Sequence, residues 1–190
     1  MMSLFSIKSF SVKSLFGLVA LLLACTVVTS VQAESKSNLA REAQKSLNTL
    51  ISTVPEAKAL NDKAIAVLVF PTITKAGFIV GGQFGEGVLF KGGKPFKYYN
   101  TAGASYGLQV GAQQYGYALF FMTDKSLNEL DSTKGFEVGV GPSVVVVDQG
   151  KGVSTTSITM THDIYAFIFS QKGLMAGIGI QGNKITRIDK

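Results

Sequence analysis

The chain has 190 residues and a mass of 20.2 kDa, with 46% apolar and 16% charged residues. This composition excludes intrinsic disorder, and the length suffices for one domain with its own hydrophobic core. One Cys and one His exclude a disulfide framework and a Cys/His zinc site built within the chain. We therefore expect no metal and no cofactor.

Residues 1–33 have the pattern of an export signal. Two lysines precede an apolar run over 15–28, and a Val-Gln-Ala sequence ending at Ala33 then offers a cleavage site. The apolar run is short for a membrane span, which needs about 20 residues. A rival pattern is a lipobox (Leu-Leu-Ala-Cys) in which Cys25 is lipidated, although the residues after it stay apolar. Both patterns predict an exported protein, periplasmic or associated with the cell envelope.

The charge balance is mildly basic. The signal holds two lysines and no acidic residue, so its removal lowers the formal net charge from +6 to +4. Such an excess suits an anionic membrane surface at least as well as nucleic acid. We expect phospholipid, and no nucleic acid, as a partner.

An N-terminal helical segment is predicted over 34–62. Ser37 is the expected N-cap of a helix that runs to about Thr53, because apolar residues such as Leu39 and Leu47 recur at helical spacing. Pro55 can begin a second, shorter helix.

From Ala64 onward, β-forming residues alternate with glycines. Hairpin turns are expected at Gly92-Gly93 and at Gly182-Asn183, and Thr123 is the expected cap of one short helix over 124–130. The candidate strands are 64–70, 77–83, 86–91, 97–109, 115–122, 137–148, 163–170, 173–180 and 183–188.

Many of these glycines fall inside the predicted strands, two or four residues apart, as at Gly177 and Gly179. Such glycines favour a strand that bends sharply or that another backbone approaches closely. The expected fold is α+β and mainly β. It is a curved, glycine-rich antiparallel sheet or a small barrel over 63–190, forming one globular unit with the helical segment 34–62 packed on it.

Catalytic patterns are weak. His162 is the only imidazole, and Asp163 beside it would point to the opposite face of a strand. A G-x-G-x-x-G sequence at 177–182 lacks the helix that a dinucleotide site needs after it. The acidic residues near 124–131 lack the spacing of a calcium loop. We expect no catalytic residues and no enzyme activity.

Longer motifs carry a resemblance to a known family. They are FP at 70–71, KAGF at 75–78, GGQFGEGVL at 81–89, YNTAGAS at 99–105, GLQVGAQ at 107–113, SQKGLMAG at 170–177 and KIT at 184–186. Together they resemble the SYLF domain family over about 63–188. The chain departs from the family pattern at Phe136, where an aromatic residue, often Trp, is usual, and at Gly141-Pro142, where Asp-Ala is more typical.

The resemblance implies lipid or membrane binding without catalysis. Eukaryotic members of the family are tied to phosphoinositide-rich membranes and actin-patch proteins, whereas bacterial members are exported envelope proteins with proposed lipid binding. Because the signal here has the bacterial pattern, neither actin nor phosphoinositide is the expected partner. The alternative is a structural or protein-interaction module of the envelope, which would hold another envelope protein by a sheet edge or a glycine-bare face.

Three groups of residues are candidates for contact with a membrane, and each has a purely structural alternative. In the first helix, Arg41 and Lys45 carry charge, but the apolar face of the same helix can simply cover the sheet. The basic turn over 91–99 is the second, and it can equally be an ordinary solvated hairpin. Its candidate side chains are Lys91, Lys94, Lys97 and Tyr98, and Lys75 of the KAGF motif is a further candidate.

The glycines of the third group can let a backbone approach a phosphate. The alternative is a tight hairpin. They are Gly81, Gly82, Gly85 and Gly87.

Overall fold

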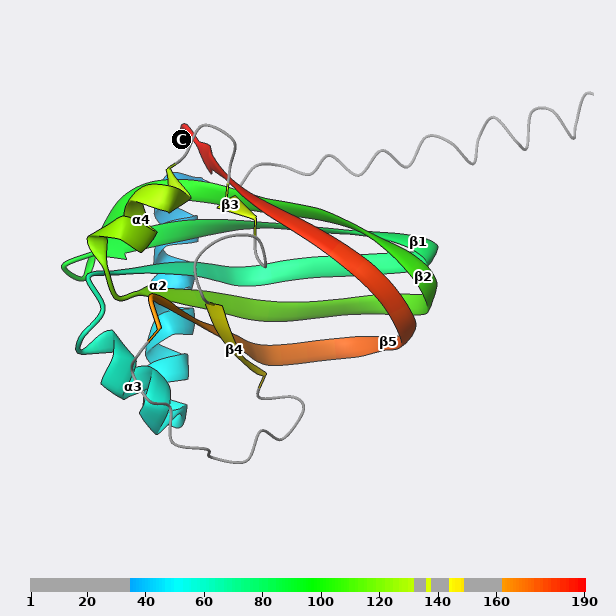
Figure 1. Ribbon diagram of the computed structural model, residues 1–190, viewed down its shortest axis with the longest axis horizontal. Helices are drawn as coiled ribbons and strands as arrows, with labels where there is room; N and C mark the ends of the chain where they lie inside the picture. The colour runs from blue at the N-terminus through cyan, green and yellow to red at the C-terminus, as the bar shows by residue number, and fades with distance from the viewer. Residues whose placement is uncertain (1–34, 132–135, 138–143, 149–161) are drawn as a thin grey trace, which may run out of the picture. The chain divides into compact units, whose positions relative to one another are not determined.

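A computed structural model describes residues 35–131, 136–137, 144–148 and 162–190. Cys25 and Gly141-Pro142 lie outside them. The chain divides into two units, Met1–Ala33 and Glu34–Lys190, and everything that follows concerns the second. Its elements are α2 (Lys36–Thr53), α3 (Pro55–Asn61), β1 (Ala66–Lys91), β2 (Lys94–Phe121), α4 (Asp124–Leu130), β3 (Phe136–Glu137), β4 (Val144–Asp148) and β5 (Ile164–Ile188) (Figure 1).

Each helix begins at or directly after a residue that favours a helix N-terminus. The N-cap of α2 is Ser35, whose Oγ accepts a hydrogen bond from the Asn38 N–H at 3.4 Å, so the cap predicted at Ser37 is wrong by two residues. Pro55 opens α3, and Thr123 caps α4 by accepting from the Ser126 N–H at 3.3 Å. These two predictions are confirmed.

The sheet is open, with strand order β1-β2-β5-β3, and β4 also pairs with β5. Every pairing is antiparallel except that of β4 with β5, which is parallel. The predicted curved sheet is therefore correct and its alternative, a closed barrel, is not. The turn at Gly92 and Gly93, which have φ of 58° and 73°, joins β1 to β2 as predicted.

Three long strands replace most of the short strands predicted. The hairpin expected at Gly182-Asn183 is wrong, because β5 continues through it, with Gly182 opposite Ala104 and Asn183 opposite Gly103. Glycine here marks a bend within a strand and not its end. Figure 1 shows the long strands turning back at the end of the sheet farther from the helices.

The fold-back of β1 is centred on Ile79. Its two halves meet so closely that a Cβ atom on Gly87 would lie 2.8 Å from the Val69 carbonyl oxygen. At the apex, a Cβ on Gly77 would lie 2.5 Å from the Cα of Gly81. Ile79 itself has φ of 62°, a left-handed conformation that is costly for a β-branched residue, by about 1–3 kcal/mol.

We call this region the distal bend and define it as residues 74–84, 102–114 and 172–184. Cross-strand pairing bounds it, because Gln114 lies opposite both Thr74 and Lys172. It holds ten of the 21 glycines in the chain. This concentration explains how three adjacent strands can bend at one place.

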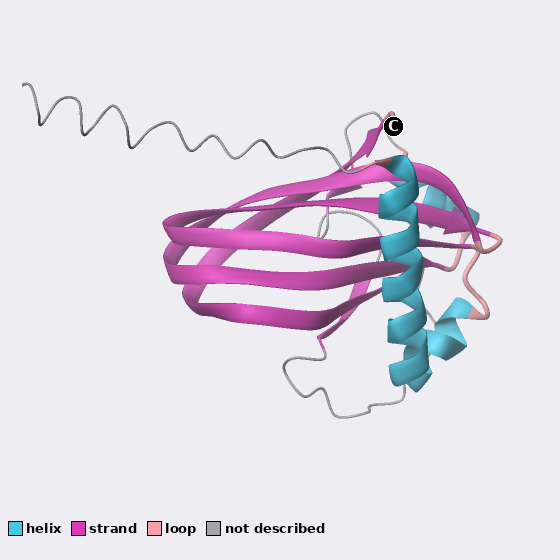
Figure 2. Cartoon of the chain, turned by 180° about the vertical axis from the view of Figure 1, so that it is seen from behind, coloured by secondary structure: helices cyan, strands magenta, loops and turns pink. Residues whose placement is uncertain are grey.

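Apolar side chains fill both faces of the sheet, which is why the first strand begins as a continuous apolar run. Successive residues of β1 alternate between two clusters, with Val67 in one and Leu68 in the other. Figure 2 shows α2 lying across one face. The first cluster joins the strands to the buried residues of the two N-terminal helices, Leu39, Ala43, Leu47, Leu50, Val54, Ala57 and Leu60.

Candidate functional site

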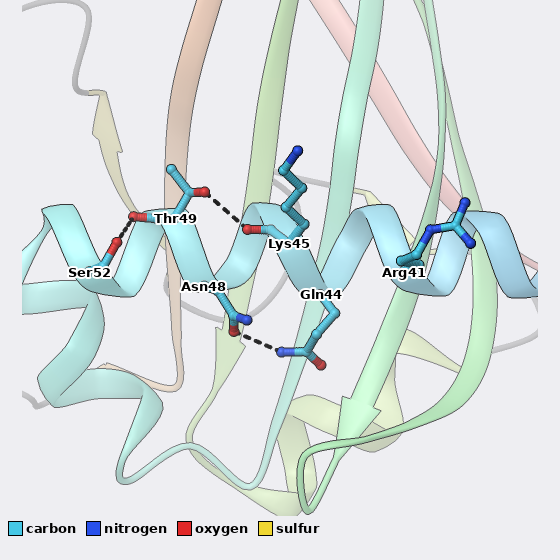
Figure 3. Close-up of a pocket in the computed structure, with 6 residues that line it drawn as sticks. All are labelled: Arg41, Gln44, Lys45, Asn48, Thr49 and Ser52. Atoms are coloured by element: carbon cyan, nitrogen blue, oxygen red, sulfur yellow. Dashed lines mark hydrogen bonds between the residues drawn. The ribbon is translucent and has the colours of Figure 1, made fainter.

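The outer face of α2 carries the first candidate pair, Arg41 and Lys45. With four neighbours on the same helix, these residues line a shallow, open pocket (Figure 3). Arg41 donates to Asn38 Oδ1 at 3.0 Å, and Gln44 Nε2 donates to Asn48 Oδ1 at 3.0 Å. All six lining residues come from one helix, so this face offers charge and hydrogen bonds without an enclosed site.

The apolar face of α2 is packed against the sheet. Leu39 and Leu50 are each 1% exposed, and Ala43 is fully buried. The structural alternative for this helix is the one observed. A membrane can therefore meet only the polar face of α2, where Arg41 and Lys45 lie.

The basic turn, residues 91–99, projects at the end of the sheet where β1 meets β2. Lys91 and Lys94 are exposed, and Phe96, near the start of β2, is 54% exposed. The Nζ atoms of Lys91 and Lys97 lie 6.0 Å and 5.0 Å from the centroid of that ring, within the range of a cation–π contact. Tyr98 is half-buried, and Lys36 Nζ lies 5.4 Å from its ring centroid.

Lys97 has an internal partner. It forms an ion pair with Asp131, the residue that ends α4, and Tyr99 donates to the same carboxylate at 2.6 Å. Burial would raise the pKa of Asp131, but the hydrogen bonds from Lys97 and Tyr99, with the charges of Lys97 and Arg187, hold it below its usual value. Burial, followed by the bond to Asp131, raises the pKa of Tyr99 well above normal. The charge of Lys97 is therefore balanced within the fold.

The candidate phosphate-binding glycines fall into different environments. Gly85 and Gly87 are buried against the first half of β1, where Thr72 and Val69 contribute the nearest carbonyl oxygens. Their missing side chains make room for the chain's own strand. Gly82 is exposed, and Gly81 lies at the apex against Gly77. The four do not line one surface.

A surface that the sequence analysis missed lies at the distal bend. Six large apolar side chains of the described residues are exposed, and all except Phe96 belong to the distal bend. Phe78 is 69% exposed, Val80 63% and Val110 56%. Lys75, half-buried, lies on the same bend. The five apolar side chains are Phe78, Ile79, Val80, Phe84 and Val110.

One signal for this surface was present in the sequence. Three consecutive apolar residues, 78–80, stand between Gly77 and Gly81. A strand with one buried face should bury alternate residues. All three are exposed, because they turn the apex of the bend and have no facing layer.

The other chemistry considered from the sequence finds little support in the described residues. His162 is exposed, and its ring meets the edge of Tyr165 at a centroid distance of 6.0 Å. Within the described ranges there is no group of three or more His, Cys, Asp or Glu residues that can hold a metal ion. In that same part of the chain, none of the helices is long and apolar enough to cross a membrane.

Comparison with known proteins supports the family resemblance. Residues 102–190 match the family model Ysc84, described as Las17-binding protein actin regulator. The match runs from within β2 to the C-terminus, and over these residues it supports the SYLF resemblance. No curated protein matches the chain. The family description names a binding partner and a regulatory role, and it names no reaction.

Proposed function

We propose that the protein is an exported, non-catalytic component of the bacterial envelope that binds lipid at an anionic membrane surface. One observation carries the proposal: five of the six exposed large apolar side chains of the described residues gather at the distal bend, and the sixth, Phe96, lies among the lysines of the basic turn. A soluble domain seldom exposes apolar side chains in a group unless that surface meets a membrane or a partner. The family description, which names a binding protein, supports a binding role.

Binding of this kind combines two physical terms. Apolar side chains gain free energy by leaving water for the boundary between headgroups and acyl chains. Each lysine near an anionic surface adds about 1 kcal/mol, and this part is screened by salt. A few apolar residues and a few lysines together give reversible attachment to the membrane surface.

Vesicle co-sedimentation tests the proposal. The protein used is the unit Glu34–Lys190, which contains all the described buried residues. Vesicles of phosphatidylcholine alone are compared with vesicles that also contain phosphatidylglycerol, at low and at high salt. We expect binding to the anionic vesicles that weakens as salt rises. No sedimentation with either kind of vesicle contradicts lipid binding.

Export is tested separately, in cells. The export signal predicts that the full chain is found in the periplasmic or membrane fraction, with a mature protein that begins at Glu34. If Cys25 is lipidated, the mature protein instead begins at Cys25, and Cys25→Ser moves it out of the membrane fraction. Recovery of the uncleaved chain in the cytoplasm contradicts export.

A second candidate function is protein binding, because the family description names a protein partner. An envelope protein would then be held on a sheet edge or on an exposed apolar surface. This candidate predicts no vesicle binding and a partner that co-purifies in a fixed ratio. The sedimentation experiment separates the two functions.

A further inference from the structure

We infer that the distal bend is the part of the protein that enters the membrane surface. The inference rests on the proposed function and says which of the two candidate ends performs it. Phe78, Ile79 and Val80 would sit at the headgroup boundary, with Val110 beside them. The helices would then lie at the end of the sheet away from the membrane (Figure 1).

The backbone presents these side chains as one surface. Gly77 and Gly81 approach so closely that residues 78–80 form a tight apex. Val110 pairs directly with Phe78 across β1 and β2. Phe84 adds a second exposed ring on the returning half of β1, 45% exposed. Five apolar side chains thus extend from one end of the sheet, whereas the basic turn offers only Phe96.

Charge identifies an anionic bilayer as the occupant. The distal bend contains three lysines and not one of the 12 acidic residues of the chain. Among the described strands the nearest acid in register is Glu137, opposite Lys184. The three lysines are Lys75, Lys172 and Lys184.

The same charge argues against a second copy of the chain as the occupant. Two copies joined bend to bend would bring like charges together, which is unfavourable. An anionic lipid surface instead attracts the lysines while it takes up the apolar side chains. The basic turn is less suited, because it exposes one large apolar side chain and Asp131 balances the charge of one of its three lysines.

The conformation of Ile79 is a further observation in favour of a function at this apex. Its φ of 62° is one that glycine or asparagine would adopt with less strain. An exposed, β-branched residue in this conformation is not explained by packing within the fold. Contact of its side chain with lipid gives a reason for an apolar residue there.

A single tryptophan reports which end enters the bilayer, because the chain has no Trp of its own. Phe78→Trp places the reporter at the distal bend, and Phe96→Trp places it at the basic turn as the matched control. Both rings are more than half exposed in water. With phosphatidylcholine–phosphatidylglycerol vesicles, we expect the tryptophan fluorescence of Phe78→Trp to shift to the blue and to be quenched by brominated lipid. We expect neither change for Phe96→Trp.

The outcomes separate the inference from the function on which it rests. If the protein sediments with the vesicles but only the fluorescence of Phe96→Trp shifts, the basic turn is the part that contacts the membrane. The inference then fails, and lipid binding stands. If neither variant sediments with the vesicles and neither shows a change in fluorescence, both the proposed function and the inference fail.

A substitution at the surface gives an independent test. In the double variant Phe78→Ser, Val80→Ser, two exposed side chains lose apolar area, so the fold should be unchanged by circular dichroism. We expect vesicle affinity to fall by about tenfold or more. Phe96→Ser is the control and should keep the affinity of the parent protein. Equal affinity of the double variant and the parent overturns the inference.

Discussion

At the scale of single residues, glycine is required where β1 meets itself. A Cβ atom on Gly87 would lie 2.6 Å from a ring carbon of Phe70 and 2.8 Å from the Val69 carbonyl oxygen. The ring is fully buried and the oxygen belongs to the backbone, so neither can move freely. The fold-back of the strand therefore depends on the absence of a side chain at this position.

Gly87→Ala should lower the free energy of unfolding by about 1–3 kcal/mol, because the added methyl group overpacks a buried contact. Gly82→Ala is the matched control, since its Cβ would meet only the Gly103 carbonyl oxygen, at an ordinary 3.7 Å. Urea titration of both variants measures the difference. Equal stability of the two would show that the halves of β1 are not packed this closely.

The sequence indicated that glycines inside strands mean a bend or a close approach, and this is correct. The sequence does not show which residues of the fold each glycine contacts. Gly85 was a candidate for phosphate binding, yet its nearest neighbours are Thr72 and Ile73 of the same strand. That contact joins residues 12 or 13 positions apart, and it exists only once the bend has formed.

At the scale of elements, Asp131 attaches the end of α4 to β2. Its carboxylate accepts from Tyr99, which is fully buried, and pairs with Lys97. Asp131→Ala removes the carboxylate that both side chains contact and leaves the buried Tyr99 hydroxyl without this acceptor. We expect the free energy of unfolding at neutral pH to fall by about 1–2 kcal/mol.

The pH dependence of this contribution has a definite sign. The pKa of Asp131 is lowered in the folded protein, so its stabilising effect is complete at pH values above the ordinary 3.8. The effect disappears as the pH falls through the lower, folded pKa. The stability difference between the parent and Asp131→Ala should thus narrow below about pH 4. A difference that is constant from neutral to acidic pH contradicts the assignment.

Asp62→Asn is the control for this pair. Asp62 forms an ion pair with Lys58 four residues earlier, but both side chains are more than half exposed. Surface pairs of this kind contribute about 0.3–0.5 kcal/mol. Urea titration of both variants at neutral pH should show a clearly larger loss for Asp131→Ala.

The elements themselves were predictable where local chemistry decides them. Helical spacing and caps gave the two N-terminal helices and α4, and paired glycines gave the turn after Lys91. The long strands were predicted in pieces, because some glycines, such as Gly182, were interpreted as turns between strands. Bending three strands at one place depends on pairing between distant residues, as when Gly111 meets both Gly77 and Met175. The exposed apex follows from that bend and was not expected.

At the scale of the whole unit Glu34–Lys190, the acidic residues are unevenly distributed. The distal bend has none, whereas the opposite end, with the basic turn and the helices, carries charges of both signs. An anionic membrane should therefore attract the bend more strongly than the rest of the protein. The protein would meet the surface in one orientation.

Charge reversal at a single lysine tests this orientation. Lys172→Glu places an acid on the distal bend, and Lys125→Glu makes the same change in net charge on α4; both lysines are exposed. Reversal at Lys172 changes the charge by two units, so at about 1 kcal/mol for each charge near the lipid it should weaken binding to anionic vesicles by about thirtyfold at low salt. The loss should shrink as salt screens the surface, because only the electrostatic part of the affinity has changed. Equal losses for the two variants would mean that attraction depends on net charge alone and that the distal bend has no preferred contact with the membrane.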